Sequence, residues 1–146
     1  MKVHPVQHMR WKHDHNKGEI LRKKILLVED SKFLRNSLKR TLEYAGYEVT
    51  AAENGQKGLE HIQVSQNNGH AFNLLVTDIL MPVMTGTELI QSIAMAGINI
   101  PVLVITNLHS YQREHLSGFS PNLHVLEKPF DPNQLEDAIA KILLVG

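Results

Sequence analysis

The feature that most constrains the fold of this sequence is an alternation, from residue 24 onward, of short strand-like runs with segments of helical periodicity. The apolar run Ile25–Val28 is typical of a strand that is buried on both faces, as in a parallel sheet between two helical layers. Strands are expected at residues 25–28, 47–51, 72–77, 101–105 and 123–126. The alternation therefore predicts an α/β fold, in which helices cover both faces of a doubly wound, five-stranded parallel sheet.

Helices between the strands are indicated by apolar residues at helical spacing and by residues that favour helix ends. Leu34, Leu38 and Leu42 recur every four residues along one such segment. Gly46 follows that segment, and Asp131 stands where the N-cap of a later helix is expected. We expect helices at residues 33–45, 54–62, 85–96, 110–117 and 131–142, the fourth being weak and polar, and a polar loop at residues 65–71.

The first 23 residues differ in composition from the rest of the chain, since they are basic and poor in apolar side chains. Their histidines are His4, His8, His13 and His15. We interpret residues 1–23 as a flexible arm, with a short basic helical stretch around residues 18–24, and residues 24–146 as one folded domain. The histidines could bind Zn²⁺ or Ni²⁺, but histidines without fixed spacing on an arm are more often solvated.

Composition excludes several classes of protein. The 146 residues contain no cysteine, so a disulfide, a thiolate nucleophile and a cysteine-ligated metal are excluded. Lys and Arg number 15, as do Asp and Glu, so charge gives no reason to expect direct binding of nucleic acid. No apolar run approaches the roughly 20 residues that span a bilayer, and the polar N-terminus lacks the features of a secretion signal. We therefore expect a cytoplasmic protein without membrane association.

Acidic, hydroxyl and basic residues follow the expected strands at their carboxyl ends. Glu29 and Asp30 follow the first strand, Asp78 the third, Thr106 the fourth and Lys128 the fifth. In doubly wound sheets the ligand site lies beyond these strand ends. Three carboxylates repel one another and stay ionised easily only when a cation lies among them, and an all-oxygen ligand set favours Mg²⁺.

A Mg²⁺ ion beside Asp78 indicates a carboxylate that accepts a phosphoryl group. Because a carboxylate is a weak nucleophile, positioning and charge neutralisation must contribute most to the transfer. Lys128 can neutralise one phosphoryl oxygen, and the Thr106 hydroxyl can donate a hydrogen bond to another. Phosphorylation adds a charge of roughly −1.5 to −2, which would pull both side chains toward Asp78 and change the surface beyond them.

Four segments together resemble the response-regulator receiver family of two-component signalling. They are Leu27–Ser31, Val76–Gly86, Val104–Thr106 and Leu126–Phe130. The resemblance covers residues 24–145, and it is specific because the separate segments match in order and at compatible spacing. It implies a flavodoxin-like (βα)5 receiver fold for residues 24–146.

The resemblance also implies a role for each residue of the set. The metal-binding positions are Glu29, Asp30, Asp78 and, through its backbone carbonyl, Leu80. Asp78 is in addition the phosphorylated residue, Thr106 matches the switch hydroxyl and Lys128 matches the phosphate-binding lysine. The peptide bond before Pro129 matches one that is usually cis in the family.

The family resemblance further implies partners. Receivers accept the phosphoryl group from a phosphohistidine on a sensor histidine kinase or a histidine phosphotransfer protein. The chain would be a phosphoprotein rather than an enzyme, with only autocatalytic phosphotransfer and autodephosphorylation. A downstream protein target would bind the face formed by the fourth helix, the fifth strand and the fifth helix.

Three residues depart from common features of the family. Val125 occupies a position that often holds an aromatic switch residue, and a valine cannot swing into the space beside Thr106. Asn107 stands where a small residue often leaves access to the phosphate. Leu80 stands where some members have a polar residue that contacts the attacking water. The output coupling and the phosphoryl lifetime are therefore left open.

Several functions are compatible with this pattern. We expect a stand-alone switch, since the chain ends soon after the fifth predicted helix. A receiver piece of a longer regulator, with a DNA-binding or enzymatic output domain, is an alternative, as is a pseudo-receiver that is never phosphorylated. A phosphohydrolase that uses an aspartyl-phosphate is disfavoured, because such enzymes usually carry a second aspartate where this sequence has Leu80.

Overall fold

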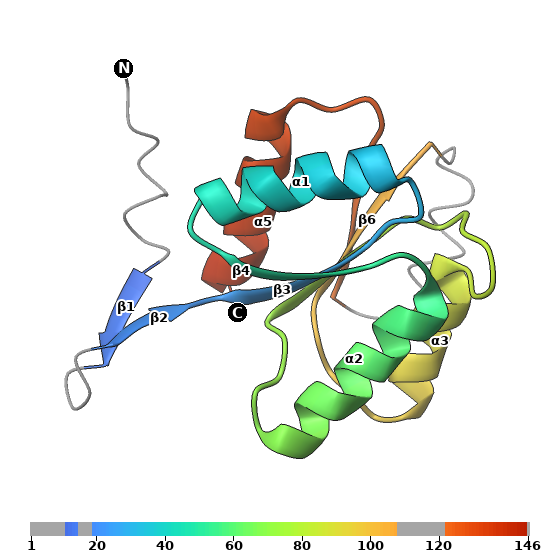
Figure 1. Cartoon of the computed structure of the whole chain (residues 1–146), viewed down its shortest axis with the longest axis horizontal. Coiled ribbons are helices and arrows are strands. Elements are labelled where there is room, and N and C mark those ends of the chain that lie inside the picture. Colours follow the sequence, from blue (N-terminus) through green and yellow to red (C-terminus); the bar gives the residue numbers. More distant parts are fainter. Residues whose placement is uncertain (1–10, 15–18, 108–121, 146) are drawn as a thin grey trace.

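The computed structural model describes residues 11–14, 19–107 and 122–145, with side chains described for residues 22–107 and 122–144. Within these residues, five parallel strands form one sheet that has helices on both faces (Figure 1). The strands are β3 (Lys24–Val28), β4 (Glu48–Ala52), β5 (Leu74–Thr77), β6 (Val102–Thr106) and β7 (Leu123–Glu127). The predicted fold class is confirmed.

The topology of the sheet determines where a ligand can bind. The strand order is β4-β3-β5-β6-β7, and each pair of neighbours is parallel. The chain moves outward from β3 to β4 and then crosses back to β5, so the order reverses between β3 and β5. In doubly wound sheets the crevice lies at this reversal, beyond the carboxyl ends of the strands. The loops after Val28 and Thr77 meet there.

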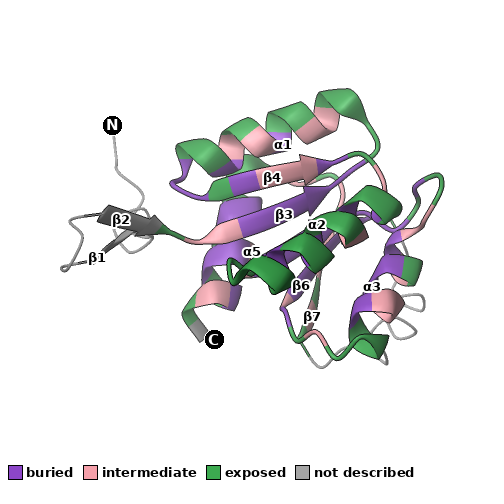
Figure 2. Ribbon diagram, turned by 60° about the horizontal axis from the view of Figure 1, so that its bottom comes forward, coloured by how far each residue is buried: buried purple, intermediate pink, exposed green. Residues whose placement is uncertain are grey.

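Helices cover the sheet in two layers (Figures 1 and 2). One face carries α1 (Lys32–Tyr44) and α5 (Pro132–Val145), and the other carries α2 (Gly55–Asn68) and α3 (Gly86–Met95). Leu42 of α1 and Ile139 of α5 share one buried apolar cluster with the sheet, and Ile62 of α2 and Leu89 of α3 share the other. The helix predicted at residues 110–117 lies outside the described residues. Among the helices that are described, none is both long and apolar enough to cross a membrane.

The central strands are buried almost throughout (Figure 2). Every residue of β5 and β6 is buried, as is every residue of β3 except Lys24. Parallel strands between two helical layers have no face in water, and this explains the continuous apolar run Ile25–Val28.

Two helices begin directly after loops at the carboxyl edge of the sheet. The Ser31 hydroxyl caps α1 by accepting a hydrogen bond from the Leu34 N–H at 3.3 Å. Thr85 and Glu88 form a capping box at the start of α3, in which each side chain accepts a hydrogen bond from the backbone N–H of the other at 3.1 Å. These caps fix the two loops that follow β3 and β5.

Helix α2 extends further than predicted. It continues to Asn68, where a polar loop over residues 65–71 is expected from sequence. Ser65 lies on the buried side of the helix, and its hydroxyl donates a hydrogen bond to the Ile62 carbonyl at 2.8 Å, so this polar residue does not end the helix. Gly69 ends it with a φ of 79°, a left-handed conformation that glycine adopts readily.

The prediction of a helical stretch around residues 18–24 is wrong. Glu19–Arg22 forms strand β2, which pairs antiparallel with β1 (Trp11–Asp14), and Lys24 already belongs to β3. A helix this short is marginal in water, whereas the pairing of two strands satisfies backbone donors and acceptors of both. The division between arm and domain at residue 23 stays a prediction.

Candidate functional site

Three acidic side chains meet beyond the ends of β3 and β5. Carboxylate oxygens of Glu29, Asp30 and Asp78, hereafter the acidic cluster, all lie within 4.8 Å of one another. Glu29 and Asp78 are buried, with exposed fractions of 1% and 9%, whereas Asp30 is exposed. The structure thus brings together the three carboxylates that the sequence analysis assigned to two separate strand ends.

The Lys128 ammonium lies against the acidic cluster. Its Nζ atom is 2.5 Å from Asp78 Oδ2 and 3.3 Å from Glu29 Oε1. The backbone N–H of Lys128 donates to the Thr106 carbonyl at 2.9 Å, so the end of β6 is hydrogen-bonded to the residue that follows β7. The peptide bond between Lys128 and Pro129 is cis, as the sequence analysis predicts.

Burial and neighbouring charges act in opposite directions on the titration of this site. Burial raises the pKa of the Glu29 carboxyl above its ordinary value, although the Ser31 N–H and the Lys128 ammonium oppose the shift. Burial alone would lower the pKa of Lys128, but hydrogen bonds and charges from Asp78 and Glu29 outweigh it and raise the pKa. Lys128 therefore stays protonated, and its single charge is shared between Asp78 and Glu29.

Backbone contacts fix the direction of the Asp78 carboxylate. The Asp78 N–H donates to the Val28 carbonyl at 3.2 Å, which extends the parallel pairing past the end of β5. Oδ1 accepts a hydrogen bond from the Ile79 N–H at 2.6 Å, and Oδ2 is the atom that contacts Lys128. Each carboxylate oxygen therefore has its own donor.

The loop after Asp78 packs tightly against the first turns of α3 and α2. Gly86, the first residue of α3, has no room for a side chain, because a Cβ atom there would lie 2.0 Å from the Asp78 carbonyl oxygen. The Gly55 N–H at the start of α2 donates to the Met84 carbonyl at 3.1 Å. Val83 has a φ of 70°, which is rare for a β-branched residue. The first residues of α2 and α3 are thus in direct contact with the backbone of this loop.

The other two predicted site residues lie at the same edge of the sheet. Thr106 is the last residue of β6 and is only 1% exposed. Leu80 follows Asp78 by two residues, and its side chain is 69% exposed, so it forms apolar surface beside the acidic cluster. The switch role of Thr106 and the carbonyl ligand role of Leu80 stay predictions.

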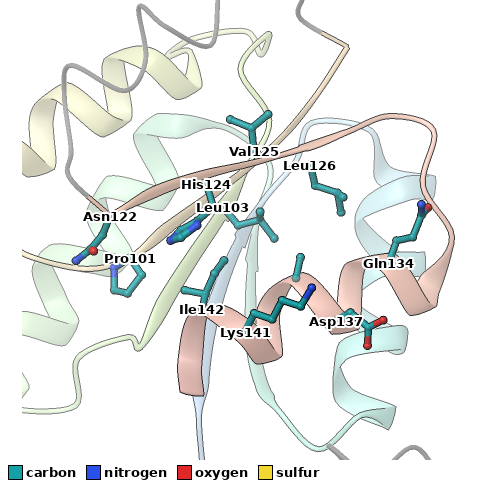
Figure 3. Close-up of a pocket in the computed structure, with 11 residues that line it drawn as sticks. Pro101, Leu103, Asn122, His124, Val125, Leu126, Gln134, Asp137, Lys141 and Ile142 are labelled. Atoms are coloured by element: carbon teal, nitrogen blue, oxygen red, sulfur yellow. The ribbon is translucent and has the colours of Figure 1, made fainter. Parts of the chain in front are cut away.

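Val125, where the family often has an aromatic switch, is half-buried and packs against the apolar cluster on the α2 and α3 face. Beside it, His124 helps to line a surface hollow of about 700 Å³ between β7 and α5, together with Asp137 and Lys141 (Figure 3). No residue of the acidic cluster lines this hollow. It belongs to the face for which sequence analysis predicts a downstream partner.

Sequence analysis missed one residue of the site, Arg35. Its Nη1 atom donates hydrogen bonds to the backbone carbonyls of Glu29 and Asp30, at 2.9 and 3.3 Å. In the sequence this residue is indistinguishable from a solvated arginine on α1. A helical side chain lies over the turn that precedes it, so its position one turn after the cap was the available signal.

Similarity to known sequences identifies a receiver domain in this chain. The model of the response regulator receiver domain matches residues 25–140. The response regulator receiver protein CpdR of Brucella abortus is 35% identical over 124 residues, which are 85% of this chain and 99% of that protein. The transcriptional regulatory protein CrdR of Helicobacter pylori is 36% identical, and the match covers 83% of this chain and 55% of that protein. The chain thus spans nearly all of the first relative and about half of the second.

Solved structures give the same result. The chemotaxis protein CheY4 of Vibrio cholerae superposes with a TM-score of 0.73 at 31% identity, covering 83% of this chain and 98% of that chain. A CheY-like receiver domain protein of Methanospirillum hungatei gives a TM-score of 0.74 at 30% identity, covering 84% of this chain and 94% of that chain. Sequence and fold therefore agree over the same region.

Proposed function

The chain belongs to the family of response regulator receiver domains, and on this premise we propose that it is a switch in which Asp78 accepts a phosphoryl group from a phosphohistidine. Receiver domains are signalling modules that work with histidine kinases and downstream targets. The observation that carries the proposal is the contact of Lys128 with Asp78 Oδ2, beside the buried Glu29.

The transfer forms one bond and breaks another. A carboxylate oxygen of Asp78 attacks phosphorus, the bond from phosphorus to the donor imidazole nitrogen breaks, and that nitrogen keeps the electron pair. The transition state is loose and carries charge on the three equatorial oxygens, so groups that bind those oxygens matter more than the strength of the nucleophile. Lys128 binds one of these oxygens, and the Thr106 hydroxyl donates a hydrogen bond to another.

The charges of the site fit a divalent cation. The acidic cluster and Lys128 together leave two negative charges unbalanced. The available ligands are all oxygen atoms, which suits Mg²⁺. Glu29, Asp30 and Asp78, with the backbone carbonyl of Leu80, would hold the ion. When bound, Mg²⁺ supplies positive charge to the phosphoryl oxygens.

Exposed apolar side chains near the acidic cluster favour a protein as the phosphoryl donor. Phe33, three residues after Asp30, is 85% exposed. Leu80 and Val83, on the loop after Asp78, are 69% and 79% exposed. Apolar residues of this size beside a polar centre are typical of protein-binding surfaces. We infer that the donor is a sensor histidine kinase or a histidine phosphotransfer protein.

Output requires a change that reaches the face of β7 and α5. On phosphorylation, Lys128 would exchange its contact with Asp78 Oδ2 for a phosphoryl oxygen. Its backbone is hydrogen-bonded to Thr106, so both strand ends would respond together. Since Val125 has no ring to rotate, we infer that the displacement of the strand ends carries the signal to a downstream protein.

A second candidate is the receiver part of a longer regulator. It is favoured by relatives such as CrdR, of which this chain covers 55%. In that case the same chemistry at Asp78 would control a DNA-binding or enzymatic output domain.

Phosphorylation can be tested with a small acyl-phosphate donor and Mg²⁺. Intact-mass analysis should show the addition of one phosphate, and a chelator should prevent it. Asp78→Asn should abolish the adduct, because an amide cannot form the acyl phosphate, whereas Asp137→Asn, on the exposed side of α5, should be labelled like the wild type. An unchanged mass under conditions that label a known receiver would refute the proposal, and an adduct on the Asp78→Asn variant would assign the acceptor elsewhere.

A further inference from the structure

Arg35, the fourth residue of α1, directs its guanidinium back onto the loop between β3 and α1. Its Nη1 atom donates to the Glu29 carbonyl at 2.9 Å and to the Asp30 carbonyl at 3.3 Å. The residue is half-buried. One cationic group thus holds two successive backbone carbonyls, and both belong to residues of the acidic cluster.

Further hydrogen bonds in this loop complete the restraint on Asp30. The Ser31 N–H donates to Glu29 Oε2 at 3.0 Å, and the Glu29 N–H donates to the Ala52 carbonyl at 3.0 Å. The peptide group before Asp30 is therefore held by Arg35 through its carbonyl. The peptide group after it is held at both ends, by Arg35 and by the Glu29 carboxylate. With both peptide groups fixed, the Asp30 carboxylate can move only by rotation within its own side chain.

We propose that Arg35 is a positioning residue for the divalent-cation site, because it holds the peptide groups from which the Asp30 and Glu29 carboxylates project. The inference rests on the proposed function, since it takes the acidic cluster to be the Mg²⁺ site. Both hydrogen bonds come from Nη1, whose two N–H groups have fixed directions in the guanidinium plane, whereas the ammonium of a lysine rotates freely and holds two carbonyls less well. Arg35 acts on the ligands through their backbone, and groups that orient metal ligands in this way affect affinity strongly.

The charge of Arg35 acts against this role. A guanidinium near the acidic cluster repels a cation, so by charge alone its removal would strengthen Mg²⁺ binding. Glu53, which follows β4, also interacts with this charge. The pKa of the Glu53 carboxyl is lowered chiefly by Lys57 and to a smaller extent by Arg35. Loss of the hydrogen bonds to the backbone would weaken Mg²⁺ binding, whereas loss of the positive charge would strengthen it. The direction in which the Kd for Mg²⁺ changes when Arg35 is neutralised therefore identifies the role of Arg35.

The test is a Mg²⁺ titration of the full chain, followed by the NMR signals of the Ser31 and Ile79 amides. These amides donate to carboxylates of the acidic cluster and so report on it directly. Arg35→Gln should raise the Kd for Mg²⁺ about tenfold, in the range seen when groups that orient metal ligands are removed. Arg35→Lys should give a smaller increase. Arg40→Gln, which removes the same charge from an exposed position on α1, should leave the Kd unchanged.

The metal-free urea midpoint separates positioning from loss of fold, and it should stay close to that of the wild type in all three variants. If the wild type binds Mg²⁺ and Arg35→Gln binds it equally well or more tightly, the positioning role is overturned and the proposed function stands. If the wild type gives no response to Mg²⁺, the metal site itself is refuted. Should Arg35→Gln fail to fold, Arg35→Lys decides the matter: weaker binding supports the role, and an unchanged Kd overturns it.

Discussion

Lys128 is the residue on which the electrostatic balance of the resting site depends most. Its ammonium contacts both Asp78 and Glu29, and its side chain is 21% exposed. The pair lies between a surface ion pair, which contributes little to stability, and a buried pair, whose disruption costs several kcal/mol. Among the side chains that the structure describes, no other cationic group is in direct contact with these carboxylates, so removing the lysine would take away the balancing charge.

Lys128→Met should lower the free energy of unfolding of the metal-free protein by about 2 kcal/mol, measured by urea denaturation with a chelator present. Mg²⁺ should restore more stability to this variant than to the wild type, since no ammonium then competes for the carboxylates. Lys141→Met, at an exposed position on α5, should change the free energy of unfolding by less than about 0.5 kcal/mol. Equal stability of Lys128→Met and the wild type would show that the contact contributes nothing measurable.

The residues of the site could be predicted from sequence to different degrees. Glu29, Asp30 and Asp78 could be found because parallel strands bring their carboxyl ends to one edge, and residue type then indicates the chemistry. Arg35 was missed, because its partners are backbone carbonyls, which every residue has, and only its position one turn after the helix cap pointed to them. The pairing of Lys128 with Asp78 Oδ2 likewise depends on side-chain conformations that no sequence pattern specifies.

Among the elements of the fold, the start of α3 packs directly against the backbone of the loop that follows Asp78. A Cβ atom at Gly86 would lie 2.0 Å from the Asp78 carbonyl oxygen, and the Gly86 N–H donates to the Ile79 carbonyl at 2.9 Å. The atoms that a Cβ at Gly86 would meet belong to the backbone of Asp78 and Ile79, so no side chain can rotate aside to relieve the clash.

Gly86→Ala should lower the free energy of unfolding by roughly 2–3 kcal/mol, because the added methyl group forces the Asp78 backbone to shift. It should also slow labelling by the acyl-phosphate donor, which intact-mass analysis over time would measure. Thr87→Ala, at the next position of the same helix, should change stability by less than about 1 kcal/mol. A Gly86→Ala protein with wild-type stability and labelling would contradict the tight packing of this loop.

Sequence patterns predict the central strands of this fold but not all of the boundaries of its helices and strands. The central strands could be predicted because strands buried on both faces, such as Ile25–Val28, are apolar throughout. The end of α2 could not, because Ser65 meets its hydrogen-bonding needs within the helix and so does not act as a breaker. The pairing of Trp11–Asp14 with Glu19–Arg22 was missed because basic and polar residues dominate this region and hide its strand pattern.

At the scale of the whole molecule, the site links segments that are distant in sequence. Lys128 is 99 residues from Glu29 and 50 from Asp78. An unfolded chain does not bring the three carboxylates together, so a cation that binds the acidic cluster stabilises only the folded state. Metal binding and global stability should therefore be coupled.

Mg²⁺ at about 100 times its Kd should add about 2.7 kcal/mol to the free energy of unfolding and raise the Tm by roughly 5–10 °C. Calorimetry or thermal denaturation followed by circular dichroism would measure the shift, and a chelator should reverse it. Asp30→Asn should lose most of the gain, whereas Asp137→Asn, on α5, should keep it. A Tm that does not depend on Mg²⁺ would contradict binding at the acidic cluster.

The order of the site residues along the chain has a consequence for protein synthesis. A ribosome adds Glu29, Asp30 and Asp78 before it adds Lys128, which follows Asp78 by 50 residues. A nascent chain that has grown past Asp78 but not yet to Lys128 therefore carries the three carboxylates without the ammonium that contacts two of them, and without the edge strand β7. The charge balance of the acidic cluster is completed only after synthesis has passed Lys128.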